Sequence, residues 1–138
     1  MKREFAIAVK GVIVREDRAL VLHRSKKEME SSYMNRHQKW DLPGGGLHFS
    51  ERTEVGLLRE VFEETGLQVE VGEPISVFDV IRGQIHLCIL TYICFWKQGE
   101  VQLSEEHEAF FWMTKEDIRN SKMPFWMKRD LFRGLEKE

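Results

Sequence analysis

The sequence has no hydrophobic run long enough to cross a membrane. Its longest apolar stretch, IHLCILTYICFW at residues 85–96, is shorter than the ~20 apolar residues of a spanning helix and includes polar side chains. The first residues, MKREFAIAVKGVIV, carry Lys10 inside the apolar run and have no small-residue cleavage site, so they predict a first strand rather than a signal peptide. We therefore expect no membrane partner.

The sequence also has little net charge and few cysteines. The formal charge is −2, from 21 Lys and Arg against 23 Asp and Glu, which gives no electrostatic reason to expect nucleic-acid binding. The only two cysteines, Cys88 and Cys94, lie in the one apolar run. On a strand they would be roughly 20 Å apart at ~3.3 Å per residue, too far for a disulfide. We expect both to be reduced core residues of a cytoplasmic protein.

What the sequence does contain is the pattern of one mixed α/β domain over residues 1–138. No repeat or linker divides it, and its 42% hydrophobic and 32% charged residues are typical of a globular protein. Residues 25–39 are polar and predict a long functional loop. The apolar runs predict strands at 6–16, 19–24, 68–71, 75–81, 85–96 and 109–113, the strand at 85–96 being central and covered on both faces. The predicted architecture is a mixed sheet sandwiched between helices.

Two helices are predicted. In residues 52–65 the apolar period becomes helical, and Gly66 stands where a C-terminal cap belongs. Its predicted apolar face consists of Val55, Leu58, Val61, Phe62 and Thr65. A capping box at Thr114–Asp117 precedes a helix after Pro124, with residues 127, 131 and 135 in register.

The helix at 52–65 carries three carboxylates that crowd one side. Glu60, Glu63 and Glu64 fall within roughly 100° of arc, and like charges at such spacing repel. Gly56 lies in the same arc, where we expect the preceding PGGG loop to cross close to the helix. Stacked carboxylates after a glycine turn suit Mg²⁺, which prefers oxygen ligands and bridges them to phosphates. The alternative is an ordinary solvated face.

The wider spacing resembles a known family. Residues 45–67 match the Nudix box, G-x5-E-x7-R-E-U-x-E-E-x-G-U, at every defined position. At roughly 6% frequency for each fixed residue, chance odds are below ~10⁻⁶. The Trp-Asp-Leu-Pro-Gly-Gly lead-in and the Ser-Glu-Glu-His…Trp stretch at 104–112 also look like the family. The chain is therefore identified as resembling a small, MutT-like Nudix hydrolase.

The resemblance implies a metal site and a mechanism. Members use Mg²⁺ or Mn²⁺ to hydrolyse a nucleoside diphosphate linked to another group. By position, Glu60 and Glu64 would be the main metal ligands and Glu63 a further one, with the carbonyl of Gly44 completing the site. Glu60 would also be the base for the attacking water, oriented by Arg59. Glu51 would be either structural or catalytic.

Two departures from the family pattern affect the remaining ligands. Many relatives carry a glutamate where this chain has His48, and often another where it has Ala109. The candidates for a distal carboxylate are Glu105, Glu106 and Glu108, of which we favour Glu106. We expect His107 to be a surface or packing residue, because no second histidine stands at metal-ligand spacing.

Substrate contacts are predicted around the polar loop. Arg24, at a strand end, is a candidate phosphate contact, the alternative being an exposed strand-end arginine. The loop is locally basic, which would suit a polyphosphate, although such runs are usually solvated; its basic residues are Lys26, Lys27, Arg36, His37 and Lys39. Tyr33, Phe78 and Trp126 are candidates to stack a base, but aromatics are more often core residues.

The predicted function is metal-dependent cleavage of a diphosphate bond in a small-molecule nucleotide. A nucleoside triphosphate, cleaved to the monophosphate and pyrophosphate, is the first choice. The alternatives are a nucleotide sugar, a dinucleoside polyphosphate, or a non-catalytic nucleotide-binding regulator. The motif names neither the base nor the sugar, and it leaves the oligomeric state open, a homodimer included.

Overall fold

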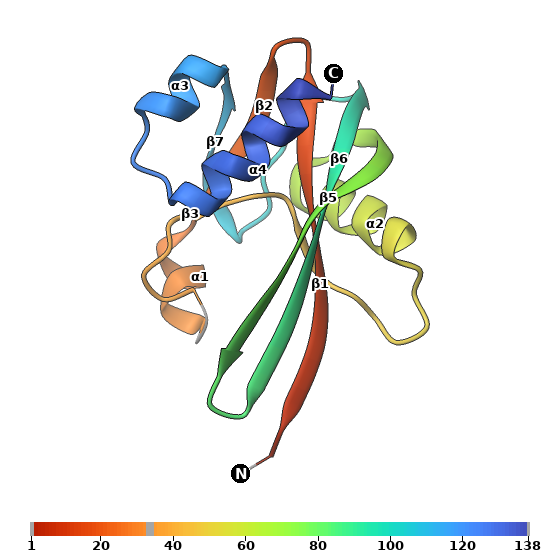
Figure 1. The fold of residues 1–138 in the computed structure, drawn as a ribbon, viewed down its shortest axis with the longest axis vertical. Coiled ribbons are helices and arrows are strands. Elements are labelled where there is room, and N and C mark those ends of the chain that lie inside the picture. Colours follow the sequence, from red (N-terminus) through yellow and green to blue (C-terminus); the bar gives the residue numbers. More distant parts are fainter. Residues whose placement is uncertain (1, 33–34, 138) are drawn as a thin grey trace.

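The computed structural model describes residues 2–32 and 35–137 (Figure 1). The predicted stacking residue Tyr33 lies outside them. In chain order the elements are β1 Glu4–Arg15, β2 Arg18–Arg24, α1 Lys26–Ser31, β3 Trp40–Asp41, β4 Gly44–Gly46, α2 Thr53–Thr65, β5 Gln68–Arg82, β6 Ile85–Gln98, β7 His107–Met113, α3 Lys115–Asn120 and α4 Phe125–Glu136. No helix of the described chain is long and apolar enough to cross a membrane.

All the strands belong to one mixed sheet in the order β3-β2-β1-β6-β5, with β4 paired to β1 and β7 paired to β2. β1 and β6 are parallel, and the other pairs are antiparallel. One edge of β1 pairs with β4 at Ala8–Lys10, and the same edge pairs with β2 only at Val14 and Arg15. The sheet therefore forks along β1, and Lys10 lies at the fork.

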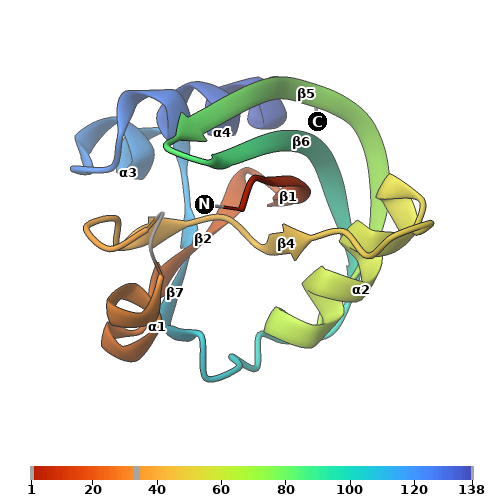
Figure 2. The same ribbon diagram turned by 90° about the horizontal axis from the view of Figure 1, so that it is seen from below.

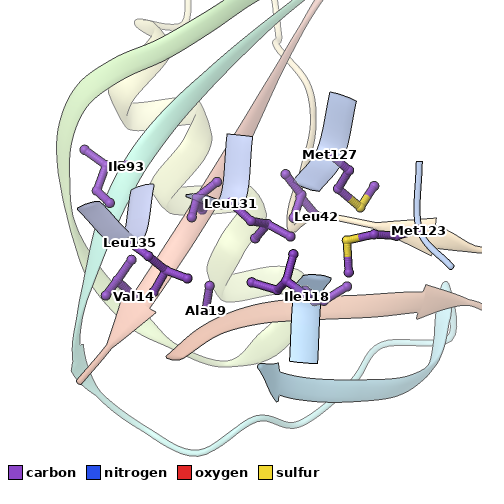
Figure 3. Packing of buried hydrophobic residues seen from close by; sticks show 11 residues of the cluster. Val14, Ala19, Leu42, Ile93, Ile118, Met123, Met127, Leu131 and Leu135 are labelled. Atoms are coloured by element: carbon purple, nitrogen blue, oxygen red, sulfur yellow. The ribbon is translucent and has the colours of Figure 1, made fainter. Parts of the chain in front are cut away.

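The helices cover opposite faces of the sheet (Figure 2). Alternate residues of β1 enter two separate cores: Val12 packs with residues of α3 and α4, and Ile13 packs with residues of α2. Met127, Leu131 and Leu135 of α4 are buried in the first core, as the sequence predicts (Figure 3). The predicted mixed sheet between helices is confirmed.

The predicted apolar face of α2 is wrong in part. Val61 and Thr65 are buried, but Val55, Leu58 and Phe62 are 41–57% exposed. The buried face consists instead of Gly56, Leu57, Val61, Glu64 and Thr65. A helical wheel that places every glutamate on the outer side predicts an apolar face that is rotated from the face that is buried in the structure. The limits of the helix and the left-handed cap at Gly66 (φ 74°) agree with the prediction.

Three further expectations need correction. The predicted loop at 25–39 contains a short helix, α1, whose N-cap Ser25 accepts a hydrogen bond from the Glu28 amide. The two strands predicted at 68–71 and 75–81 are one strand, β5, whose register shifts around Pro74.

β6 does lie between β1 and β5, but its described residues are buried only near its middle, at Thr91, Ile93 and Cys94. Cys88 is consequently only half-buried, and the expectation of a core position holds for Cys94 alone. Both thiols are free, as predicted.

The capping box at the start of α3 is confirmed. The Thr114 hydroxyl accepts from the Asp117 amide, and the Asp117 carboxylate accepts from the Thr114 amide. This box stabilises a helix of six residues, and Ile118 anchors it in the first core.

Candidate active site

The three clustered glutamates of α2, Glu60, Glu63 and Glu64, differ in exposure. Glu64 is buried at 4% exposure, the Glu60 side chain is 15% exposed, and the Glu63 side chain is 56% exposed. A solvated acidic face would expose all three alike. Only Glu60 and Glu64 line the cavity described below, whereas Glu63 is not among its lining residues.

The glycine turn of β4 lies directly on these carboxylates. The amide of Gly44 donates a 3.2 Å hydrogen bond to Oε1 of Glu64. Gly44 has a φ of 139°, and a Cβ there would overlap the carbonyl oxygen of Val9. A Cβ at Gly45 would lie only 2.7 Å from the Glu60 carboxylate. Gly44 therefore lets the turn lie directly against β1, and a side chain at position 45 would displace the Glu60 carboxylate.

Arg59 links the carboxylates of the helix to the loop before it. Its Nε and Nη2 donate to both oxygens of Glu51 at 2.8 and 2.9 Å, and its Nη1 donates to Glu60 at 3.2 Å and Glu63 at 3.3 Å. The Arg59 hydrogen bonds lower the pKa of Glu51 to about 2. Glu51 therefore remains ionised and holds the guanidinium beside Glu60.

Glu51 in turn depends on Gly56 for space. A Cβ at Gly56 would overlap Leu47 and lie 2.8 Å from a Glu51 oxygen. The close crossing predicted at Gly56 is thus present, made by the residues just after the glycine turn. Glu51 also accepts a hydrogen bond from the His48 amide, so its neighbours fit a positioning role.

A buried charge network lies beneath the glutamates, at the fork in the sheet. Oδ1 of Asp41 accepts from Lys10 at 3.0 Å and from Arg24 at 2.8 Å, and Oδ2 lies 2.8 Å from Nε2 of His107. Burial would raise the pKa of Asp41, but Lys10, His107 and Arg24 together outweigh it and hold that pKa well below its usual range. Asp41 is therefore ionised and serves as the acceptor for all three.

Lys10 also contacts the predicted metal-site carbonyl. Its Nζ donates to the carbonyl oxygens of Leu42 at 3.2 Å and Gly44 at 3.3 Å. Neither Lys10 nor Asp41 was predicted as a site residue. The signal for Lys10 was its charge inside an otherwise apolar strand, and Asp41 lies next to the glycine turn in WDLPGGG.

Glu64 lacks enough positive charge for its buried position. Burial raises the pKa of its carboxyl to about 9, Lys10 opposes that rise, and Asp41 and Glu106 add to it. A carboxylate in such surroundings becomes stable as an anion when a cation binds beside it. The residues therefore fit a divalent cation, with Glu60, Glu64, Glu106 and the Gly44 carbonyl as the oxygen ligands within reach of the cavity.

A cavity of about 710 Å³ joins these groups to an apolar wall. Glu60, Glu64 and Glu106 line one part, while β5, β6 and α4 contribute an apolar part with Phe78, Leu87, Ile89 and Trp126. The rings of Phe78 and Trp126 are stacked, with centroids 6.3 Å apart and planes inclined by 10°. The lining of the cavity thus includes both carboxylates and aromatic rings.

The structure separates the remaining predicted site residues. All three distal candidates are exposed, and of them only Glu106 is among the residues that line the cavity. Arg24 lines the cavity but is buried, not an exposed strand-end residue, and it donates to Gln38, Trp40 and Asp41. Lys39 is exposed and is not among the lining residues, so its phosphate contact stays a prediction. His107 is buried, which agrees with a packing position.

The fold and the site define an α/β protein whose glycine turn and helix bring carboxylates to the fork of a mixed sheet, beside an aromatic-lined cavity. A family model of the NUDIX domain matches residues 4–133. The chain belongs to the Nudix family.

Named relatives and a solved structure agree with this assignment. A MutT-like protein of Streptomyces ambofaciens is 36% identical over 115 residues, covering 82% of this chain and 66% of its own length. The nucleoside triphosphatase NudI of an Escherichia coli strain is 34% identical over 91 residues, covering 58% of this chain and 64% of that protein. The matches thus span just under two thirds of these relatives. The crystal structure of the MutT protein from Methanosarcina mazei Go1 superposes with a TM-score of 0.79 at 27% identity, covering 99% of this chain and 97% of that one.

Proposed function

We propose that the protein is a metal-dependent pyrophosphohydrolase that cleaves a diphosphate bond in a nucleoside triphosphate, giving the monophosphate and pyrophosphate. The observation that carries this proposal is the composition of the cavity lining, which combines carboxylates with a stacked pair of aromatic rings. The carboxylates suit a cation with its phosphates, and the aromatic rings suit a planar base. The names of the MutT-like and NudI relatives favour the same class of substrate.

In the proposed reaction Glu60 takes the proton of the attacking water. The water oxygen bonds to a phosphorus, and the bridging P–O bond breaks with its electron pair leaving on pyrophosphate. Arg59 holds Glu60 at 3.2 Å while Glu51 fixes Arg59, so the base is positioned before substrate arrives. Glu64, Glu106 and the Gly44 carbonyl would hold Mg²⁺ or Mn²⁺, with Glu63 as an outer ligand. When bound, the cation neutralises the phosphates and the charge that develops on the leaving group.

The substrate end of the site is assigned from the same cavity. Phe78 and Trp126 would hold the base between or against their rings, and the buried Arg24 would contribute positive charge near the phosphates. Lys39 would contact the phosphates only from outside the cavity. We expect no nucleic-acid substrate, since a 710 Å³ cavity is the size of a small-molecule site.

A substrate panel tests the proposal. Nucleoside triphosphates, nucleotide sugars and dinucleoside polyphosphates are incubated with Mg²⁺, and nucleoside monophosphate and pyrophosphate are quantified. We expect both products in equal amounts from a triphosphate, and none in the presence of a chelator. Preference for a sugar or dinucleoside substrate would replace the proposed substrate. Turnover of none of them, with nucleotide still bound, would identify a regulator.

A further inference from the structure

His107 has a feature that packing alone does not explain. Its side chain is 2% exposed, and its Nδ1 is buried without a hydrogen-bond partner among the described residues. Buried polar atoms are normally satisfied, so an unpaired ring nitrogen indicates a missing partner. Its surroundings identify what kind of partner that is.

The network beneath the site fixes which atom of His107 is available. Oδ1 of Asp41 already accepts from Lys10 and Arg24, and the ionised carboxylate can only accept hydrogen bonds. Nε2 of His107, 2.8 Å from Oδ2, must therefore carry the proton. In the neutral imidazole this leaves a lone pair on Nδ1. A carboxylate that orients one nitrogen while the other faces a cation is the usual support of a metal-binding histidine.

Two carboxylates lie close to this imidazole. One ring nitrogen of His107, either Nδ1 or Nε2, and one carboxylate oxygen each from Glu64 and Glu106 lie within 4.8 Å of one another, and all three residues line the cavity. Glu64 comes from α2, Glu106 from the loop before β7, and His107 from the first position of β7. Two ionised carboxylates carry a charge of −2, which offsets one divalent cation. Lys10 and Arg24 both pair with Asp41, and Lys10 also interacts favourably with Glu64 and Glu106.

We propose that His107 is a nitrogen ligand, which together with Glu64 and Glu106 forms a mixed nitrogen–oxygen site for a first-row divalent metal such as Mn²⁺ in preference to Mg²⁺. Imidazole favours transition metals over Mg²⁺, which takes oxygen ligands. The inference rests on the proposed function only in placing the cation beside Glu64. It adds a ligand that the oxygen set of the glycine turn and helix does not include.

Pulsed electron paramagnetic resonance of the Mn²⁺-loaded full chain tests the proposal without nucleotide. We expect the electron spin echo to be modulated by the nitrogen of a directly bound imidazole. Labelling the histidines with ¹⁵N should replace the ¹⁴N modulation frequencies by those of ¹⁵N. His107→Gln should abolish it while keeping a donor for Asp41. His86→Gln is the matched control, because His86 pairs with Asp79 and does not line the cavity. This variant should keep the signal.

Titration calorimetry gives a second readout. His107→Gln should weaken Mn²⁺ binding by about 10-fold or more and leave Mg²⁺ binding within about twofold. Absence of nitrogen coupling in the wild-type protein with Mn²⁺ bound would overturn the proposal, whether or not the variant folds. Coupling that survives in His107→Gln would also overturn it. Because no nucleotide is present, these outcomes are independent of whether the protein hydrolyses the proposed substrate.

Discussion

Replacing Glu64 by glutamine should make the metal-free protein more stable at neutral pH while it damages the active site. Burial raises the pKa of the Glu64 carboxyl from 4.5 to about 9, whereas the unfolded chain loses that proton near 4.5. Because the folded-state pKa is the higher one, this group's contribution to stability is complete below pH 4.5 and is lost as the pH rises towards 9. Each pH unit in this window removes up to ~1.4 kcal/mol, or ~3 kcal/mol between pH 5 and 7.

Glutamine has the shape of a protonated glutamate and does not titrate. Its carbonyl oxygen can accept the 3.2 Å hydrogen bond from the Gly44 amide, so the fold should be retained. We therefore expect the free energy of unfolding of Glu64→Gln, minus that of the wild type, to rise by ~3 kcal/mol between pH 5 and 7. Taking this difference cancels the titrating groups that do not interact with Glu64.

Urea unfolding in chelator at pH 5, 6 and 7 measures this difference. Glu63→Gln is the matched control, since its side chain is 56% exposed and the substitution should leave the difference nearly independent of pH. Adding Mn²⁺ should then stabilise the wild type much more than Glu64→Gln. A difference that does not change with pH would mean that Glu64 is ionised in the metal-free fold, and the argument from burial would be wrong.

The remaining predictions concern the base, the glycine turn and the thiols. Glu60→Gln should lower kcat by ~10²–10⁴-fold, because the attacking water loses its base. Its Tm should change little, because Arg59 keeps its two hydrogen bonds to Glu51. Normal turnover would assign the Glu60 carboxylate to a solvated face. Gly45→Ala should push the Glu60 carboxylate aside and lower kcat by ~10²-fold. Gly46→Ala, where a Cβ meets nothing within 4 Å, should keep wild-type kcat, and equal loss in both variants would refute the contact argument. In native buffer a thiol reagent should label half-buried Cys88 well before Cys94, whose pKa burial raises to about 12; equal rates, measured by mass spectrometry, would contradict this.

Local spacing is what made the helix and its carboxylates predictable. Glu60, Glu63 and Glu64 lie within five residues of each other, and the cap at Gly66 and the crossing at Gly56 depend on neighbours close in the chain. The packing direction of α2 was misjudged because the most deeply buried carboxylate, Glu64, was counted as part of the outward face. Sequence periodicity cannot show that a charged residue is buried when its reason for burial is a site.

The residues that the sequence did not reveal are joined through the sheet. Asp41 contacts Lys10 from 31 positions away and His107 from 66 positions away. These contacts depend on how far β2 and β4 follow the same edge of β1 before they part, which is a matter of strand pairing rather than of local pattern. A lysine in an apolar strand and an aspartate before a glycine turn each look ordinary until the sheet brings them together.

The fork in the sheet also connects the carboxylates of α2 with the residues of the buried charge network. Gly44 pairs with Lys10 across β4 and β1. The turn that approaches Glu64 is therefore fixed to the strand that carries Lys10. Lys10 then holds Asp41 ionised, and Asp41 sets the proton on Nε2 of His107. The buried network therefore sets the charges around groups that the helix alone could not control. A substitution such as Asp41→Asn would leave every glutamate of α2 in place and still remove the negative charge that Lys10, Arg24 and His107 contact.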